Sequence, residues 1–146
     1  MEHLYKRISD TASFLSFQDQ LRSCNLPWED LDFARDLMVG YYEGDQLVGT
    51  GALEIHGAYA LLRSLSVRLG LRGRSVGSTI TEYLLNEANA RNIEAVYLLT
   101  ETARGFFQRK GFREVPRDQV PGEVTGSAEF SHLCPTTAVA MMLPLK

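Results

Sequence analysis

The sequence predicts an α+β fold with a mixed, mostly antiparallel sheet of six to seven strands. Two observations support this fold class. Residues 36–55 alternate with the two-residue period of strands, an apolar strand follows at 59–67, and turn residues separate these strands, which is typical of antiparallel neighbours. Two other stretches, 12–24 and 76–91, follow the 3.6-residue period of helices. No linker or repeat divides the chain, so we expect a single domain over residues 1–146.

Composition limits the classes of partner that the chain can have. With 146 residues, 45% hydrophobic content and 23% charged content, the chain is typical of a soluble globular domain. The net charge of −3 argues against nucleic acid, because binding a phosphate backbone requires a basic surface. No apolar run approaches the roughly 20 residues that cross a bilayer, and the first ten residues do not resemble a signal peptide. We therefore expect a cytoplasmic protein with no membrane partner.

The first half of the chain is expected to contain a strand, a helix and a hairpin. A short strand is expected at 3–8, and the capping cluster at 9–11 favours a helix over 12–24 that Pro27 terminates. The turn residues at 43–46 predict a hairpin over 36–49 whose return strand continues to about residue 55. Its even positions share one face: Thr50, Ala52, Glu54 and His56. Gly49 and Gly51 interrupt the other face, which indicates a bulge or a close approach of backbone.

In the second half, a strand at 59–67 is followed by a basic turn at 72–77 and a helix from 76. Asn92 is a plausible left-handed residue after that helix. A buried strand at 95–99 and a short helix at 102–110 follow. Residues 116–135, rich in proline, glycine and polar residues, are expected to form a long, partly ordered surface segment. A last strand at 136–143 ends at Pro144.

The basic turn is the strongest functional signal in the sequence. A strand that continues into a helix through such a turn leaves backbone N–H groups unpaired at the positive end of the helix dipole, which suits an anion. Arg72 and Arg74 add positive charge. We interpret the turn as a cradle for the pyrophosphate of a nucleotide-containing cofactor. The alternative for the two arginines is solvated surface charge.

The motif and its context resemble a known family. Residues 72–77, RGRSVG, align with the Q/R-x-x-G-x-G/A turn of the GNAT superfamily of N-acetyltransferases, with Ser75 in place of the usual glycine. The stretches on either side of the turn resemble that family's strands and fourth helix. They are LVGTGALEI and LLRSLSV before the turn, and LLTETARGFFQRKGF after it. The chain is therefore identified as a member of this superfamily. The resemblance implies the GNAT fold with helices on both faces of the sheet, acetyl-CoA as acyl donor and no metal.

The resemblance also implies a set of cofactor contacts. In this family the pantetheine arm pairs with the fourth strand in an opening beside the fifth, and the pyrophosphate lies on the basic turn. A tyrosine of the fourth helix usually assists the leaving thiolate, but Phe107 stands at that position here and cannot donate a proton. The cofactor-binding residues implied are Leu65, Ser66, Val67, Arg72, Gly73, Arg74, Ser75, Val76, Gly77, Ser78, Thr100 and Phe107.

Catalysis needs a group that accepts a proton, because an amine is mostly protonated at neutral pH. Glu54 is the candidate base, and the alternative is that it is an exposed carboxylate or one on an edge strand. Arg63 interrupts an apolar strand, so it either anchors a substrate carboxylate or extends to the surface. Glu101 is a candidate substrate contact, or a negative charge at a helix N-terminus.

Two closer likenesses bear on the acceptor. Residues 98–112, with EF-x-x-LCP-x-x-A at 129–138, are similar to small GNAT proteins of arsenic-resistance operons, and 98–112 is also similar to the acetyltransferase domain of glutamate N-acetyltransferases. Both imply a small-molecule amine, such as an amino acid or a toxic analogue. The alternatives are a peptide amine bound by the acidic stretch at 28–32, or a non-catalytic acyl-CoA-binding regulatory module. A homodimer is compatible with edge strands near the C-terminus.

Overall fold

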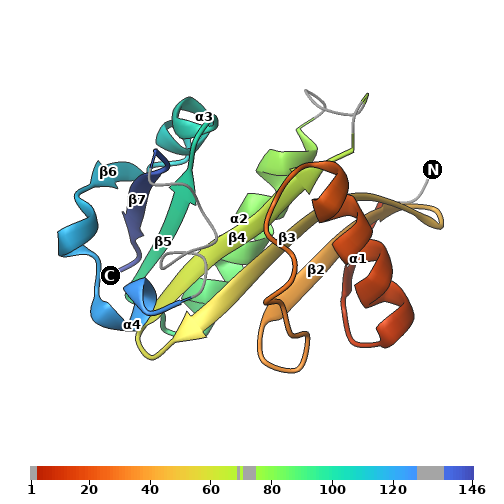
Figure 1. Ribbon diagram of the computed structural model, residues 1–146, viewed down its shortest axis with the longest axis horizontal. Coiled ribbons are helices and arrows are strands. Elements are labelled where there is room, and N and C mark those ends of the chain that lie inside the picture. Colours follow the sequence, from red (N-terminus) through yellow and green to blue (C-terminus); the bar gives the residue numbers. More distant parts are fainter. Residues whose placement is uncertain (1–2, 69, 71–74, 128–136) are drawn as a thin grey trace. The chain divides into compact units, whose positions relative to one another are not determined.

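The computed structural model describes residues 3–68, 70, 75–127 and 137–146 (Figure 1). The expected α+β class is confirmed, with a mixed seven-stranded sheet in the order β1-β2-β3-β4-β5-β7-β6. The elements are β1 (His3–Arg7), α1 (Thr11–Ser23), β2 (Leu37–Glu43), β3 (Gln46–His56), β4 (Tyr59–Val67), α2 (Val76–Ala90), β5 (Ala95–Thr100), α3 (Arg104–Arg109), β6 (Arg113–Val115), the 3₁₀ helix η1 (Arg117–Gln119), α4 (Gly122–Thr125) and β7 (Val139–Pro144).

The chain separates into two compact units. Unit 1 comprises Met1–Glu54 and Leu62–Glu87, and unit 2 comprises Ile55–Leu61 and Ala88–Lys146. Strand β4 contributes to both. Its first residues pair with β5 in parallel, with Tyr59 opposite Ala95. The expectation of one domain over 1–146 remains a prediction. Among the described residues, no helix combines the length and the apolar character that crossing a membrane would require.

In unit 1, α1 and α2 cover opposite faces of the sheet (Figure 1). Phe17 and Leu21 of α1 are fully buried and pack in one cluster with Ala52 of β3. The neighbouring residue Gly51 points to the other face, where Ile80 of α2 approaches it. Helix α1 begins where Asp10 accepts a hydrogen bond from the Ser13 N–H at 2.8 Å, so the expected capping cluster is confirmed.

The two glycines of β3 allow α2 to pack closely. A Cβ at Gly51 would lie 2.6 Å from Cγ2 of Ile80 and 2.7 Å from Cδ1 of Leu84, and a Cβ at Gly49 would lie 3.1 Å from the carbonyl oxygen of Ser66. The expected close approach of backbone is therefore confirmed at Gly49. At Gly51 the neighbours are side chains of the helix.

Gly51→Ala should consequently lower the free energy of unfolding by about 1–3 kcal/mol, because the added methyl group overpacks the interface between β3 and α2. Gly122→Ala is the matched control. A Cβ there meets nothing within 4 Å, so the change should stay within about 0.5 kcal/mol. Urea denaturation of both variants checks the prediction, and equal stabilities for the two would contradict it.

Unit 2 has its own core, in which Leu61, Tyr97, Val124 and Ala140 pack together.

The structure confirms three further expectations from the sequence. These are the hairpin at 36–49, the strand at 59–67 and the left-handed Asn92, with φ of 60°.

The described part of the expected surface segment at 116–135 does lie largely at the surface, but it is more ordered than expected. Residues 116–127 contain η1 and α4, and they bury Val120 and Val124. Pro116 and Pro121 immediately precede these two short helices, with φ of −61° and −56°. Both prolines are N-cap residues with extended backbone, with ψ of 144° and 145°, so they lie just outside the helices and interrupt neither. The rest of the segment, 128–136, lies outside the described residues.

Candidate active site

Strand β4 departs from regular strand geometry at Ser64. This residue has φ of 63°, in the left-handed region that non-glycine residues rarely adopt, and its side chain is buried. Such a conformation costs on the order of 1–3 kcal/mol, so the surrounding structure must hold it. Thr50 of β3 does so, because its hydroxyl donates to the Ser64 carbonyl oxygen at 2.7 Å.

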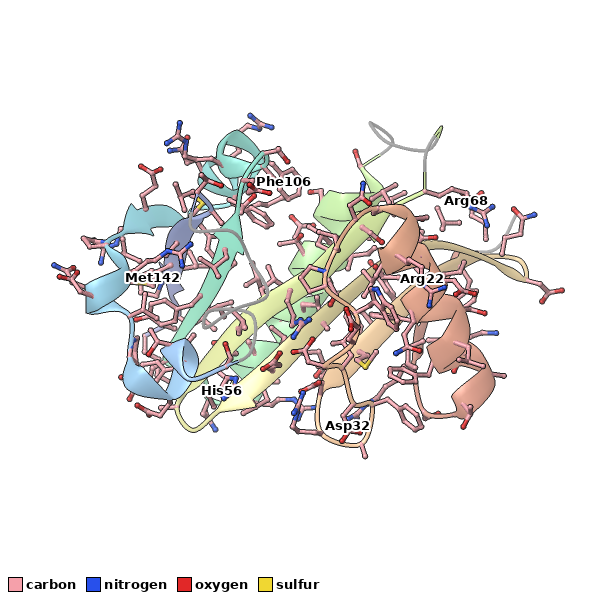
Figure 2. All side chains as sticks on the ribbon, viewed as in Figure 1. Arg22, Asp32, His56, Arg68, Phe106 and Met142 are labelled. Atoms are coloured by element: carbon pink, nitrogen blue, oxygen red, sulfur yellow. The ribbon has the colours of Figure 1, made fainter. Side chains whose placement is uncertain are left out.

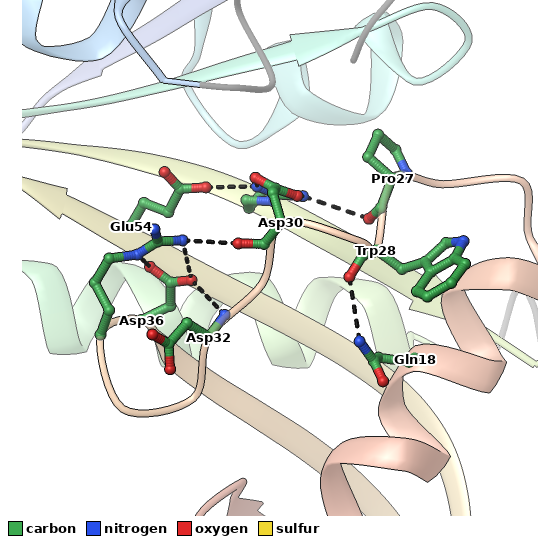
Figure 3. A network of polar contacts seen from close by, with 9 residues as sticks. Gln18, Pro27, Trp28, Asp30, Asp32, Asp36 and Glu54 are labelled. Atoms are coloured by element: carbon green, nitrogen blue, oxygen red, sulfur yellow. Dashed lines mark hydrogen bonds and ion pairs between the residues drawn. The ribbon is translucent and has the colours of Figure 1, made fainter.

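The residue before Ser64 is Arg63, whose side chain is completely buried. Its Nη1 donates to Oε2 of Glu54 and to Oδ2 of Asp30, each at 2.5 Å, and its Nη2 donates to Oδ1 of Asp30 at 2.8 Å (Figure 3). The pairing with Asp30 is therefore bidentate, the strongest arrangement for an arginine and a carboxylate. Glu54 is also buried, with 5% of its side chain exposed. Two carboxylates thus share one guanidinium group.

A second ion pair braces the loop that carries Asp30. Arg35 donates from Nε and Nη2 to the buried carboxylate of Asp36, at 2.8 and 2.9 Å. The same Nη2 donates to the Asp30 carbonyl oxygen at 3.0 Å, and the Asp32 N–H donates to Asp36 at 3.2 Å. The hydrogen bond to Asp36 is the largest cause of the raised pKa of Arg35. The loop between α1 and β2 is thereby tied to the start of β2.

These positions exclude the surface alternative for both Glu54 and Arg63, and the catalytic and substrate-binding roles stay predictions. Glu54 is not an exposed edge carboxylate, and Arg63 does not extend to the surface. The structure brings Glu54 and Arg63 together, and it adds Asp30, which the sequence suggested only as one acid of the stretch 28–32. Arg35 and Asp36 were not anticipated. We call Asp30, Glu54 and Arg63 the buried charge cluster.

Asp30 makes the cluster sensitive to acid. Burial alone would raise the pKa of Asp30, but its hydrogen bond and charge interaction with Arg63 outweigh burial, and the pKa lies below its usual value of 3.8. A carboxyl group whose pKa is lower in the folded than in the unfolded state stabilises the fold above the unfolded pKa. That stability is lost as the pH falls through the folded pKa.

We therefore expect Asp30→Asn to be less stable than the wild type by about 1–3 kcal/mol at pH 7, because a hydrogen bond to a charged group is lost. The difference should begin to shrink below about pH 4, where the unfolded wild-type chain starts to bind a proton at Asp30, and it should be lost as the pH falls through the lower pKa of the folded protein. Melting temperatures measured from pH 7 to pH 3 check this. A difference that stays constant across this range would contradict it.

The predicted pyrophosphate turn is only partly described. Arg72, Gly73 and Arg74 lie outside the described residues. Ser75 is left-handed, with φ of 64°, and its carbonyl oxygen accepts a hydrogen bond from the Thr79 N–H at 3.0 Å. Helix α2 begins at Val76 with no acidic residue in its first turn. No carboxylate in this turn opposes an anion at the N-terminal N–H groups, and the binding of pyrophosphate here stays a prediction. Gly77 and Ser78 belong to this first turn.

The remaining predicted cofactor contacts of unit 1 lie at the end of β4. Leu65, Ser66 and Val67 are its last three residues. Ser66 is buried, and its hydroxyl lies 2.5 Å from the hydroxyl of Thr50.

The candidate residues of unit 2 have local partners. The Thr100 hydroxyl accepts a hydrogen bond from the Ala103 N–H at 3.0 Å, just before α3. Glu101 is exposed and accepts a hydrogen bond from the Thr137 hydroxyl at 2.9 Å. Phe107 is buried, and its ring centre lies 5.6 Å from that of Phe112. These positions leave their predicted roles as cofactor or substrate contacts untested.

His56 is half-buried at the end of β3 (Figure 2). Within the described ranges, no three His, Cys, Asp or Glu side chains gather as a metal site would require.

Comparison with known proteins gives the family. Residues 34–114 match the model of the acetyltransferase (GNAT) domain. The fold is similar to that of Rv2747 from Mycobacterium tuberculosis, solved with CoA and NLQ, with a TM-score of 0.79, 21% identity and coverage of 98% of this chain and 99% of that one. N-acetylglutamate synthase from Neisseria gonorrhoeae, solved with coenzyme A and N-acetyl-glutamate, gives a TM-score of 0.79 and 12% identity over 100% of this chain and 36% of that one. The ribosomal-protein-S18-alanine N-acetyltransferase from Escherichia coli gives a TM-score of 0.75 and 16% identity, over 99% of this chain and 95% of that one.

The fold and the matched domain define an acyltransferase. The chain belongs to the GNAT acetyltransferase family, as the sequence motif indicated. It is an acetyl-CoA-dependent acetyltransferase, and the expectations for enzyme class and acyl donor are confirmed. The expectations of a cytoplasmic location and of a homodimer remain predictions.

Proposed function

We propose that this acetyltransferase acetylates the amino group of a small molecule, an amino acid or a close analogue. The observation that carries the proposal is the buried charge cluster, in which two carboxylates, Glu54 and Asp30, share the single guanidinium group of Arg63. Arg35 also interacts electrostatically with both carboxylates. Carboxylates at this place favour an acceptor that arrives as an ammonium ion.

In this proposal Glu54 accepts the proton that the ammonium group must lose before it can attack, directly or through a water molecule. Arg63 and Asp30 hold the Glu54 carboxylate in place. Arg63 is bound by two carboxylates in this structure. We therefore assign it the role of positioning Glu54 in preference to that of binding a substrate carboxylate. Glu101, exposed at the end of β5, remains a candidate contact for the rest of the acceptor.

For acetyl-CoA, we propose that the first turn of α2 and the basic residues before it bind the pyrophosphate, and that the end of β4 binds the pantetheine arm. The absence of acids in the first turn of α2 supports this. When bound, acetyl-CoA supplies a thioester that the amine can attack. Thr100 and Phe107 are proposed as further cofactor contacts. Phe107 offers no proton, so the thiolate either leaves unaided or is protonated by another group.

Two similar proteins support the choice of acceptor. One was solved with coenzyme A and N-acetyl-glutamate and another with CoA and NLQ. Peptide acetylation is the rival proposal, since the fold also resembles an enzyme that acetylates an alanine of a ribosomal protein. That rival needs the acids of residues 28–32 to face a basic peptide, but Asp30 is bound to Arg63.

Release of free thiol from acetyl-CoA, measured with a panel of acceptors, tests the proposal. The panel contains glutamate, glutamine, other amino acids, simple amines without a carboxylate, and a basic peptide. We expect the highest kcat/KM with an amino acid. A clear preference for the peptide, or no acceptor-dependent thiol release at all, would reject the proposal.

A further inference from the structure

Arg35 has one edge of its guanidinium group fixed and another edge open. Its Nε and Nη2 donate to the carboxylate of Asp36, whose side chain is 1% exposed, at 2.8 and 2.9 Å. Nη2 also donates to the carbonyl oxygen of Asp30 at 3.0 Å. Among the described residues this side chain makes no further hydrogen bond, so Nη1 donates to none of them, and 56% of the side chain is exposed. The guanidinium group is therefore a cation held in one orientation, with Nη1 left for a ligand.

This cation lies beside the buried charge cluster. Asp30 joins the two, because its carboxylate binds Arg63 and its carbonyl oxygen binds Arg35 (Figure 3). The hydrogen bond to Asp36 contributes most to the raised pKa of Arg35. The negative charges of Glu54 and Asp30 lie near enough to raise that pKa further. A guanidinium group with an open edge and the carboxylates of the cluster therefore lie side by side.

This arrangement of charge is complementary to a free α-amino acid. At neutral pH such an acceptor carries an ammonium group and a carboxylate on the same carbon atom. In the proposed function the ammonium group gives its proton to Glu54, so the carboxylate needs a cation a short distance away. Arg63 is unsuited to this role, because its side chain is completely buried and bound by two carboxylates. Arg35 has the open edge that a carboxylate can contact.

We infer that Arg35 is a specificity-determining residue whose Nη1 binds the carboxylate of the acceptor. The inference rests on the proposed function and narrows it to acceptors that carry a carboxylate next to the amino group. Asp36 fixes the guanidinium group before the acceptor arrives, which lowers the entropy lost on binding. Arg35 takes no part in proton transfer or in the attack on the thioester.

Paired acceptors measure the contribution of Arg35 to recognition. Each amino acid of the panel is compared with its α-carboxamide, which keeps the amino group and lacks the negative charge. Arg35→Gln should lower kcat/KM for the amino acids by about 10- to 100-fold, mainly through KM, because a hydrogen bond to a charged group is lost. For the carboxamides, kcat/KM should stay within about threefold of the wild type. An equal loss for both kinds of acceptor would overturn the inference.

Two variants at Asp36 separate recognition from a structural role. Arg35→Gln leaves the buried carboxylate of Asp36 without its cation, so Arg35→Gln/Asp36→Asn is measured as well. The double variant should melt closer to the wild type and still lose the preference for amino acids over carboxamides. Asp36→Asn alone weakens the brace but keeps the guanidinium group, so it should retain most of this preference. If Asp36→Asn loses the preference as fully as Arg35→Gln does, Arg35 only braces the loop and the inference is wrong.

Arg104→Gln is the matched control. The side chain of Arg104 is as exposed as that of Arg35, at 56%, and it also pairs with a carboxylate, but it lies in unit 2. This variant should leave kcat/KM unchanged for both kinds of acceptor.

The same measurements distinguish failure of the inference from failure of the proposed function. A wild type that acetylates no amino acid would reject both. If amino acids are acetylated, and the ratio of kcat/KM between amino acid and carboxamide is the same in the wild type and in Arg35→Gln, only the inference is rejected.

Discussion

Arg63→Met is expected to lower the free energy of unfolding by about 3–5 kcal/mol, the usual cost of removing one partner from a buried ion pair. Methionine fills much of the same volume, so the loss comes from the charge. Without the guanidinium group, the carboxylates of Glu54 and Asp30 lie close together with no cation between them. Chemical denaturation at pH 7 measures the effect.

A surface pair provides the control. Arg104 contacts Glu114 at 2.6 Å, close to the distances within the buried charge cluster, but both side chains are about half exposed. Exposed pairs contribute little, so Arg104→Met should leave the free energy of unfolding nearly unchanged. Neutralising the two acids of the cluster, in Asp30→Asn/Glu54→Gln/Arg63→Met, should recover part of the loss. An Arg63→Met variant as stable as the wild type would show that the cluster is not held by charge.

Glu54→Gln is expected to have the largest effect on activity among the carboxylate variants. If Glu54 takes the proton of the acceptor amine, kcat at neutral pH should fall by about 10²- to 10⁴-fold, the range for loss of a general base. Glutamine is almost isosteric and can still accept a hydrogen bond from Arg63, so the fold should persist. Steady-state thiol release measures kcat.

The pH dependence distinguishes a lost base from a damaged site. Above the pKa of the acceptor amine the free amine needs no base, so the deficit of Glu54→Gln should shrink as the pH rises. Glu114→Gln replaces an exposed carboxylate that also contacts an arginine, and it should leave kcat unchanged. A Glu54→Gln enzyme with wild-type kcat at neutral pH would remove Glu54 from the mechanism.

The sequence was sufficient to predict most of the fold. Apolar runs bounded by turn residues placed the hairpin and β4, although these strands are buried on both faces and their burial does not alternate. The sequence did not reveal the short helices within 116–127, because Pro116 and Pro121 suggest a loop but immediately precede these helices. A proline constrains only its own backbone, so whether a loop or a helix follows depends on the packing of residues such as Val120 and Val124.

The candidate site was predictable only in part. Arg63 was identified because a charge in an apolar strand needs a cleft or a partner, and Glu54 was identified separately as a candidate base. The two lie nine residues apart in sequence on neighbouring strands. Asp30 is 33 residues from Arg63, and a loop without regular periodicity carries it. No local pattern could pair the two. The left-handed Ser64 gives no signal either, because serine has no preference for that conformation and Thr50 holds it through a tertiary contact.

The most direct test of the proposed function is to identify the acetylated product. Wild-type protein is incubated with acetyl-CoA and a mixture of amino acids, simple amines and a basic peptide, and every acceptor is analysed by mass spectrometry. The proposal predicts that one or a few N-acetyl amino acids form in amounts equal to the CoA released. Acetylation of the peptide alone, or release of CoA without any acetylated amine, would contradict it.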